Sequence, residues 1–287
     1  MTLIVRGATT EINARPTQGQ LAHAEGNTSL AIGVGSHTEG FATTTTIGAP
    51  YGHAEGNSTT VSANYGHAEG LSTTSSANYA HAEGSSSIAS GQSSHAEGTS
   101  TASGVCAHSE GASTVASGDY SHAASSSGVA SRYGQNVSSS STFASAGDCQ
   151  ANKFTANRIS TSATPVELTF NGSATVALTG NATNVLTVPI NKGHRFRIDA
   201  LARRSDSGDE WAAWTITGTI VRGPSGNARF LATPISATEA DAAAAAWTLA
   251  VSVNTGNATN NYLAITATGE AAKTIRWNAT LTTTEVG

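Results

Sequence analysis

The chain has 287 residues, is dominated by small side chains, and carries a formal net charge of −5 at neutral pH. Charged residues make up 11% of it, against roughly 25% in an ordinary soluble domain, and Leu, Ile, Val and Phe together make up about 16%. This composition disfavours a conventional large-cored α/β enzyme. The net charge is too small for typical disorder. We therefore expect a repetitive architecture built on small residues.

The N-terminal segment, residues 1–20, has a short apolar run followed closely by Arg6 and Glu11, without the core of a secretory signal. No stretch of the chain approaches the roughly 18 consecutive apolar residues of a membrane span. We expect this segment to attach the protein to an upstream component, without membrane insertion. The two cysteines define no disulfide framework. We expect no cofactor and no nucleic-acid partner.

Residues 21–150 contain an internal repeat that is seen when the histidines are aligned. Eight of the nine histidines recur at intervals of 13 to 16 residues, most often 14, and seven of them open a His-x-Glu-Gly unit. Fourteen residues can hold two short strands and two turns, which is one coil of a β-solenoid. The expected ladder consists of His23, His37, His53, His67, His81, His95, His108, His122, Glu25, Glu39, Glu55, Glu69, Glu83, Glu97 and Glu110.

Two columns of the repeat are candidates for the inward-facing side of each coil. The position one after His is mostly Ala, and the position seven after His includes Leu30, Thr44, Thr60, Thr74 and Ile88. Such small columns bury little apolar area per coil. Coils of this kind must stack, and we expect them also to associate with other chains.

The repeat unit, as in Ser94-His95-Ala96-Glu97-Gly98, resembles the head repeats of trimeric autotransporter adhesins. The same repeats occur in bacteriophage tail fibres and tailspikes. The resemblance covers roughly residues 21–150. It implies a left-handed parallel β-roll wound by three chains, and therefore a homotrimer.

The ladder is strongly acidic, because no Lys or Arg occurs between Arg15 and Arg132. Successive coils would stack Glu above Glu at ~4.8 Å, which is unfavourable without a compensating partner. We expect an ordered hydrogen-bonded or ionic ladder with a structural role. Metal binding and pH sensing by the histidines remain alternatives. A second column, formed by Tyr51, Tyr65, Tyr79 and Tyr120, is either a packing ladder or a stripe that stacks on sugar rings.

Past residue 150 the composition changes, since all four tryptophans and 11 of the 14 basic residues lie there. We expect a linker over residues 151–164 and an antiparallel β-sandwich over residues 165–287, because apolar and polar residues alternate with a period of two. The expected strands include Val166–Phe170, Val185–Ile190, Phe196–Ala200, Trp214–Ile220, Arg229–Ile235, Trp247–Val253, Tyr262–Thr268 and Thr274–Thr282. Ala242–Ala246 is either a helical turn or a strand entry, and His194 is expected at a strand edge.

One polar loop of this domain is the candidate receptor contact. The run Asp206-Ser-Gly-Asp-Glu210 reads as a hairpin or loop between two strands, next to an aromatic residue and two arginines. The arginines could instead pair with the acids of the loop. The candidate receptor-binding residues are Asp206, Asp209, Glu210, Trp211, Arg203 and Arg204.

The segment Arg195–Arg204, followed by Trp211-Ala-Ala-Trp214, resembles the C-terminal domains of phage tail fibres, as does Gly269–Trp277. This resemblance implies a trimeric tip that contacts the host surface. No recognisable catalytic signature is present, so we expect no enzyme activity.

The sequence therefore favours a trimeric phage tail fibre, made in the host cytoplasm and carried in the virion. Its tip is expected to bind a bacterial surface glycan or protein, while its N-terminus joins a phage tail protein. Two alternatives remain: the head of a trimeric autotransporter adhesin, and a glycan-cleaving tailspike.

Overall fold

The computed structural model describes residues 19–174, 184–255 and 261–287, and the chain divides into two compact units, residues 1–99 and 100–287. The described residues are all-β apart from one short 3-10 turn, η1 (Ala242–Ala244). Of the two alternatives for Ala242–Ala246, the helical turn is therefore correct and the strand entry is not. None of the described segments forms a helix capable of spanning a membrane. The expected all-β fold class is confirmed. Most of the expected attachment segment, residues 1–18, lies outside the described residues.

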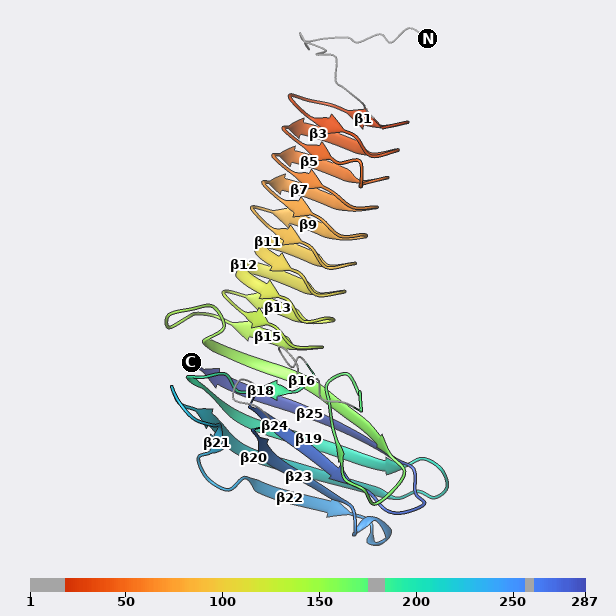
Figure 1. The fold of residues 1–287 in the computed structure, drawn as a ribbon, viewed down its shortest axis with the longest axis vertical. Coiled ribbons are helices and arrows are strands. Elements are labelled where there is room, and N and C mark those ends of the chain that lie inside the picture. Colours follow the sequence, from red (N-terminus) through yellow and green to blue (C-terminus); the bar gives the residue numbers. More distant parts are fainter. Residues whose placement is uncertain (1–18, 175–183, 256–260) are drawn as a thin grey trace. The chain divides into compact units, whose positions relative to one another are not determined.

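The first unit is a stack of coils, each with two strands (Figure 1). Equivalent residues of successive coils pair in parallel, for example His53 with His67 and Glu55 with Glu69. This register follows the 14-residue period and confirms the β-solenoid. The first strand of each coil is β1 (His23–Ala24), β3 (His37–Phe41), β5 (His53–Asn57), β7 (His67–Leu71), β9 (His81–Gly84) or β11 (His95–Ala102), and the second is β2 (Leu30–Ala31), β4 (Thr44–Thr45), β6 (Thr60–Val61), β8 (Thr74–Ser75) or β10 (Ile88–Ala89).

The interior of the coils is made of small residues, as expected, but one of the two predicted columns is wrong. The alanines one position after His are inward, and Ala54, Ala68 and Ala82 are fully buried. The column seven after His is half-exposed, and Ile88 is 41% exposed. The buried positions are instead six and eight after His, such as Thr59. A residue with positive φ between the two strands of each coil, such as Ser58, changes which alternate side chains point inward.

Several hydroxyl groups inside the coils bond to the backbone or to one another, whereas those of Thr38, Thr43, Thr59 and Ser94 are buried without a partner. Ser75 Oγ donates to the carbonyl of Ala80 at 2.8 Å, and Ser87 Oγ donates to the carbonyl of Glu83 at 2.7 Å. A buried hydroxyl costs little free energy once it is hydrogen-bonded. Serine and threonine can therefore replace aliphatic residues in this narrow interior, which explains the composition of the repeat.

The second unit contains further coils and a β-sandwich. Its coil strands are β12 (His108–Ala116), β13 (His122–Ser125), β14 (Val129–Ala130) and β15 (Asn136–Ser139), and they pair in parallel like those of the first unit. The last of them, β15, pairs antiparallel with the long strand β16 (Cys149–Ser160). Parallel coils thus change to antiparallel strands within one continuous ladder.

The sandwich has two antiparallel sheets. The larger sheet runs in the order β16, β25 (Ile275–Val286), β19 (Lys192–Arg204), β20 (Trp211–Arg222) and β22 (Ile235–Ala240), with β21 (Arg229–Phe230) also on β20. The smaller sheet has β24 (Tyr262–Thr268) paired with β17 (Val166–Glu167), β18 (Leu186–Thr187) and β23 (Thr248–Asn254). Each expected run overlaps a strand, but β17 and β18 are only two residues long, and the run 229–235 is divided between β21 and the start of β22. Buried and exposed residues alternate regularly along β19, β20 and β25, whereas β22 is exposed along its whole length.

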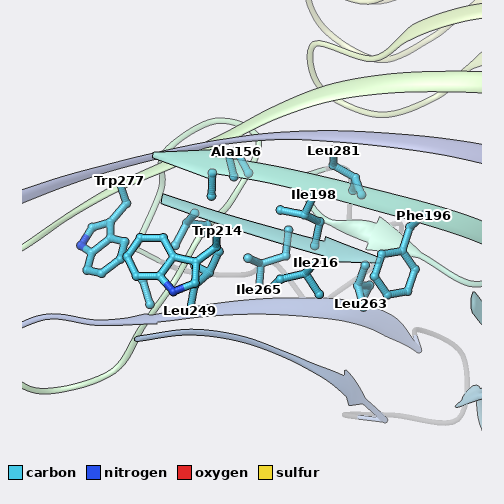
Figure 2. Packing of buried hydrophobic residues seen from close by; sticks show 14 of the residues in the cluster. Ala156, Phe196, Ile198, Trp214, Ile216, Leu249, Leu263, Ile265, Trp277 and Leu281 are labelled. Carbon is cyan, nitrogen blue, oxygen red and sulfur yellow. The ribbon is translucent and has the colours of Figure 1, made fainter. Parts of the chain in front are cut away.

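The apolar core lies between the two sheets (Figure 2). Ile198 and Ile216 from the larger sheet face Leu249, Leu263 and Ile265 from the smaller one. Three tryptophan rings meet at one end: Trp214 on β20, Trp277 on β25 and Trp247, which directly precedes β23. The ring centroids of Trp214 and Trp277 lie 5.4 Å apart. The apolar core of the sandwich is much larger than the clusters inside the coils. The sandwich can therefore hold the loops at its edge in fixed positions.

Two expectations in this unit need correction. Residues 151–164, expected as a linker, lie mostly in β16, which pairs with β25 along its whole length. His194, expected at a strand edge, lies on the central strand β19 and is fully buried. In both cases exposed polar or charged residues alternate with the apolar ones, which obscures how central the strand is in the sheet.

Candidate functional site

The histidines of the first unit form a continuous stack of rings. The centroids of His53 and His67 lie 4.8 Å apart with an interplanar angle of 2°, and those of His67 and His81 lie 4.6 Å apart with an angle of 11°. The parallel register of the coils imposes this spacing. The same register places each glutamate beside the glutamate of the next coil, so two parallel columns of titratable side chains run along one face.

Histidine and glutamate approach each other in two different ways. In the first four coils the contact is within one coil, and His67 Nε2, for example, lies 3.8 Å from a Glu69 carboxylate oxygen. Further along, the contact is between coils, and His95 Nε2 lies 3.3 Å from Glu83 Oε1. His122 and Glu110 repeat this second arrangement at 3.2 Å in the second unit. Histidine and glutamate thus contact each other between coils at these two places, and within a coil at the others.

The crowding of like groups shifts the ionisation of the ladder. Hydrogen bonding with Glu69, followed by burial, raises the pKa of Glu55 to about 7. Hydrogen bonding with Glu83 and Glu55 lowers the pKa of Glu69. Burial, and then the neighbouring His81, lowers the pKa of His67. A protonated Glu55 that donates to an ionised Glu69 thus relieves part of the repulsion within the carboxylate column.

The ladder also brings metal-ligating atoms together. One ligand atom each of His67, Glu69 and His81 lie within 4.8 Å of one another, and all three side chains are half-buried. Imidazole nitrogens and a carboxylate oxygen are the donor types that zinc uses in proteins. The metal alternative left open by the sequence therefore has a defined location.

The tyrosine column forms a ladder of stacked rings. Tyr51, Tyr65 and Tyr79 have successive centroid distances of 5.2 and 5.3 Å and interplanar angles of 12° and 2°. Each of these side chains is more than half exposed. Within this run, ring faces are occupied by neighbouring tyrosines, so mainly edges point to solvent. This arrangement favours the packing ladder over a stripe that stacks on sugars, because sugars stack on open ring faces.

All six candidate receptor-binding residues lie together at the β19–β20 hairpin. Trp211 is 37% exposed, its Nε1 donates to Asp209 Oδ1 at 2.6 Å, and the guanidinium of Arg203 lies 4.9 Å from its ring centroid. Arg204 bonds to both Asp206 and Glu210, at 2.5 and 2.8 Å. The arginines thus do pair with the loop: Arg203 stacks on the indole and Arg204 holds two carboxylates.

This network lowers the pKa values of Asp206 and Glu210. Hydrogen bonds from Arg204, together with backbone amides, hold the pKa of Asp206 well below its usual range. Hydrogen bonds from Lys273 and Arg204 lower the pKa of Glu210. The loop therefore presents a fixed arrangement of charge around an exposed indole, which is a common composition for a binding hot spot.

Three residues that support this loop were missed by sequence reasoning. Lys273 Nζ lies 2.8 Å from Glu210 Oε2, Thr274 N donates to Asp206 Oδ2 at 3.0 Å, and Trp211 N donates to Asp241 Oδ2 at 2.9 Å. These partners are 30 to 68 residues away from the loop residues they contact. No local pattern in the sequence connects them, since only the pairing of β19, β20 and β25 brings them together.

An open groove adjoins the hairpin on the same strands. It has a volume of about 400 Å³, and its lining includes Asp199, Leu201, Ala213, Thr215, Glu239 and Asn278. Asp199 is held by Arg197 at 2.7 Å and by Thr215 at 3.0 Å. The hairpin and the groove together form a mixed polar and apolar surface.

The chain thus has the fold of a parallel β-solenoid protein that includes an antiparallel β-sandwich. No protein-family model matches it, and no curated protein matches it. Among solved structures, it is similar to the tailspike protein of Acinetobacter phage vB_ApiP_P1, with 12% sequence identity and a TM-score of 0.24. The similarity covers 92% of this chain and 54% of the tailspike chain, so this chain spans about half of that protein's length. A likeness at this level carries no argument about function, which rests on the residues described above.

Proposed function

We propose that this protein is a trimeric, non-enzymatic fibre component of a phage tail that binds a bacterial surface glycan or protein. The β19–β20 hairpin and the adjoining groove form the binding surface, and the solenoid acts as a spacer within the virion. The observation that carries the proposal is the His-Ala-Glu-Gly coil, whose interior of small residues suits a thin fibre that gains stability from stacking and partner chains.

The hairpin supports the assignment of binding to the sandwich. Trp211 is exposed, yet it is fixed by Asp209, by Arg203 and by the backbone bond to Asp241. An aromatic side chain held in one orientation loses little conformational entropy when it binds a partner. Loops positioned by a rigid scaffold are frequent sites of recognition.

The state of the loop acids supports a binding role over glycan cleavage. A glycosidase needs one carboxyl group with a raised pKa, which donates a proton to the leaving group. The pKa values of Asp206, Glu210 and Asp199 are all lowered, the first two mainly by Arg204 and Lys273 and the third by Arg197. These groups stay ionised at neutral pH and are suited to accepting hydrogen bonds.

The test is binding of the fluorescently labelled full chain to a panel of bacterial strains. For a strain that binds, Trp211→Ala is expected to weaken binding at least about tenfold, because truncation of a central aromatic anchor typically costs more than 1.4 kcal/mol. Tyr65→Ala is the matched control, since Tyr65 is 51% exposed but lies in the solenoid. Both variants should melt close to the parent chain.

Two results would contradict the proposal. Equal losses of binding in the two variants would remove the hairpin as the binding surface. Release of new reducing ends from the host polysaccharide on incubation with the protein would show a glycan-cleaving tailspike instead of a non-enzymatic fibre.

A further inference from the structure

We propose that the ladder of the first unit binds a transition-metal cation of the Zn²⁺ class between His67, Glu69 and His81. The site lies on β7 and β9, in two adjacent coils of one chain. It adds a function that is separate from receptor binding by the hairpin.

The first argument is that the two histidines have unused ligand atoms. Among the described residues, Nε2 of His67 and Nε2 of His81 are buried and have no hydrogen-bond partner. A buried polar atom without a hydrogen-bond partner destabilises the fold, because it has lost its hydration and gained nothing in return. The next histidine along the ladder differs, because His95 Nε2 already bonds to Glu83 at 3.3 Å. Coordination of a cation would satisfy both unused nitrogens at once.

The second argument is electrostatic. The coils of residues 19–99 carry six glutamates and no lysine or arginine. The parallel register stacks these carboxylates beside one another, as Glu55 on Glu69. Protein cations are therefore absent from the described part of this unit, apart from any protonated histidine. A divalent cation beside Glu69 would compensate the stacked negative charge.

The third argument is the donor set. Two imidazoles and one carboxylate suit Zn²⁺, Ni²⁺ or Cu²⁺, whereas Mg²⁺ and Ca²⁺ prefer all-oxygen sites. The three donor atoms lie within 4.8 Å of one another, and zinc–nitrogen bonds measure roughly 2.0–2.1 Å. Closing on the metal thus requires the two stacked rings to tilt toward each other, so that their nitrogens approach by about 1 Å. Water would complete the coordination on the open side.

The experiment is calorimetric titration of the full chain with ZnCl₂ at pH 7.5, using protein made without a polyhistidine tag. Co²⁺ serves as a second probe, because its visible absorption reports coordination directly. Saturable binding is expected, and His67→Gln, His81→Gln and Glu69→Gln should each weaken it at least tenfold. Zinc should also raise the melting temperature of the parent chain more than that of these variants.

The matched control is His23→Gln, the same substitution at a ladder histidine outside the site, which should leave the zinc affinity within twofold of the parent value. Metal-free melts of all variants show whether the coils still fold. Absence of saturable zinc binding would overturn the proposal. So would binding unchanged in the folded His67→Gln and His81→Gln variants. Equal weakening in His23→Gln would indicate a diffuse cation cloud along the ladder and would also overturn it.

Discussion

Buried charge in the sandwich is concentrated around one residue, His194. Its side chain is fully buried, and its Nδ1 lies 3.9 Å from Glu285 on β25. The pKa of His194 is lowered to about 4, and burial is the largest cause. The charge of Glu285 opposes this shift, whereas the charges of Arg132 and Lys192 add to it. Lys192 in turn pairs with Glu285 at 3.2 Å. The imidazole is therefore held neutral in the middle of a charged cluster.

This cluster predicts that acid destabilises the sandwich. Below the ordinary histidine pKa of roughly 6.5 the unfolded chain takes up a proton, whereas folded His194 does so only near pH 4. Stability is therefore full above about pH 6.5 and falls as the pH drops toward 4, by at most about 1.4 kcal/mol per pH unit from this group. Urea unfolding at pH 7 and pH 5 measures the fall.

The variant His194→Gln separates this residue from the other titrating groups. It should lose less stability than the parent chain between pH 7 and pH 5, by about 1–2 kcal/mol. Identical pH dependence in the two proteins would show that His194 does not carry the effect.

At the scale of the element, each coil depends on residues with positive φ. In one coil these are Gly70 at +103°, Ser72 at +57° and Tyr79 at +61°. Glycine is required at the first position, because a Cβ on Gly70 would lie 2.2 Å from the carbonyl oxygen of Gly84 in the next coil. The other two positions are left-handed conformations that serine and tyrosine adopt at a modest cost.

This geometry predicts that Gly70→Ala opens the ladder between β7 and β9. The substitution combines an unfavourable φ with a backbone clash, and we expect it to lower the free energy of unfolding by roughly 2–4 kcal/mol. Ser72→Gly in the same coil is the control, and it should change stability by less than about 1 kcal/mol. Denaturant unfolding of the two variants measures both changes in the free energy of unfolding. If Gly70→Ala left this free energy unchanged, the close approach of the coils at Gly70 would be contradicted.

The same turns explain which parts of the fold were accessible from the sequence. The 14-residue period, the two strands per coil and the burial of the alanine after His followed from spacing alone. The second inward column did not, because the positive-φ residues change which alternate side chains point inward. As a result Thr59 and Val61 are buried, and Thr60 between them is not.

The candidate hairpin was predictable only in part. The acids, the arginines and Trp211 are adjacent in the sequence, so their cluster could be expected. Lys273 and Asp241 could not, since they reach the loop only through strand pairing across long separations. The buried position of His194 was missed for a related reason: its strand alternates arginines with apolar residues, and the exposed arginines obscure how central that strand is.

At the scale of the whole molecule, the apolar clusters inside the coils are small and consist of alanines with a single valine each, such as Val61. Fully buried side chains such as Ala68 and Ala82 contribute little area, at about 25 cal/mol per Å². Burial of further coil surface against partner chains would compensate for this deficit. We therefore expect a homotrimer of about 86 kDa, three times the 28.8 kDa chain.

Light scattering on the eluting protein measures this mass, and an SDS gel run without heating tests how tightly the chains associate. A trimer that resists SDS at room temperature is expected, because intertwined or closely packed β-structure unfolds slowly. A stable monomer of 28.8 kDa in solution would remove the trimeric fibre proposal.

One coil of the first unit is longer than its neighbours. The segment between Thr45 and Tyr51 has two more residues than the segment between Val61 and Tyr65, yet His37 still pairs with His53 and Thr44 with Thr60. The extra residues are absorbed in a turn without disturbing the register. A coil can therefore carry a longer turn without loss of the parallel register, and we expect a whole coil added to or deleted from the stack to leave the remaining coils paired as before.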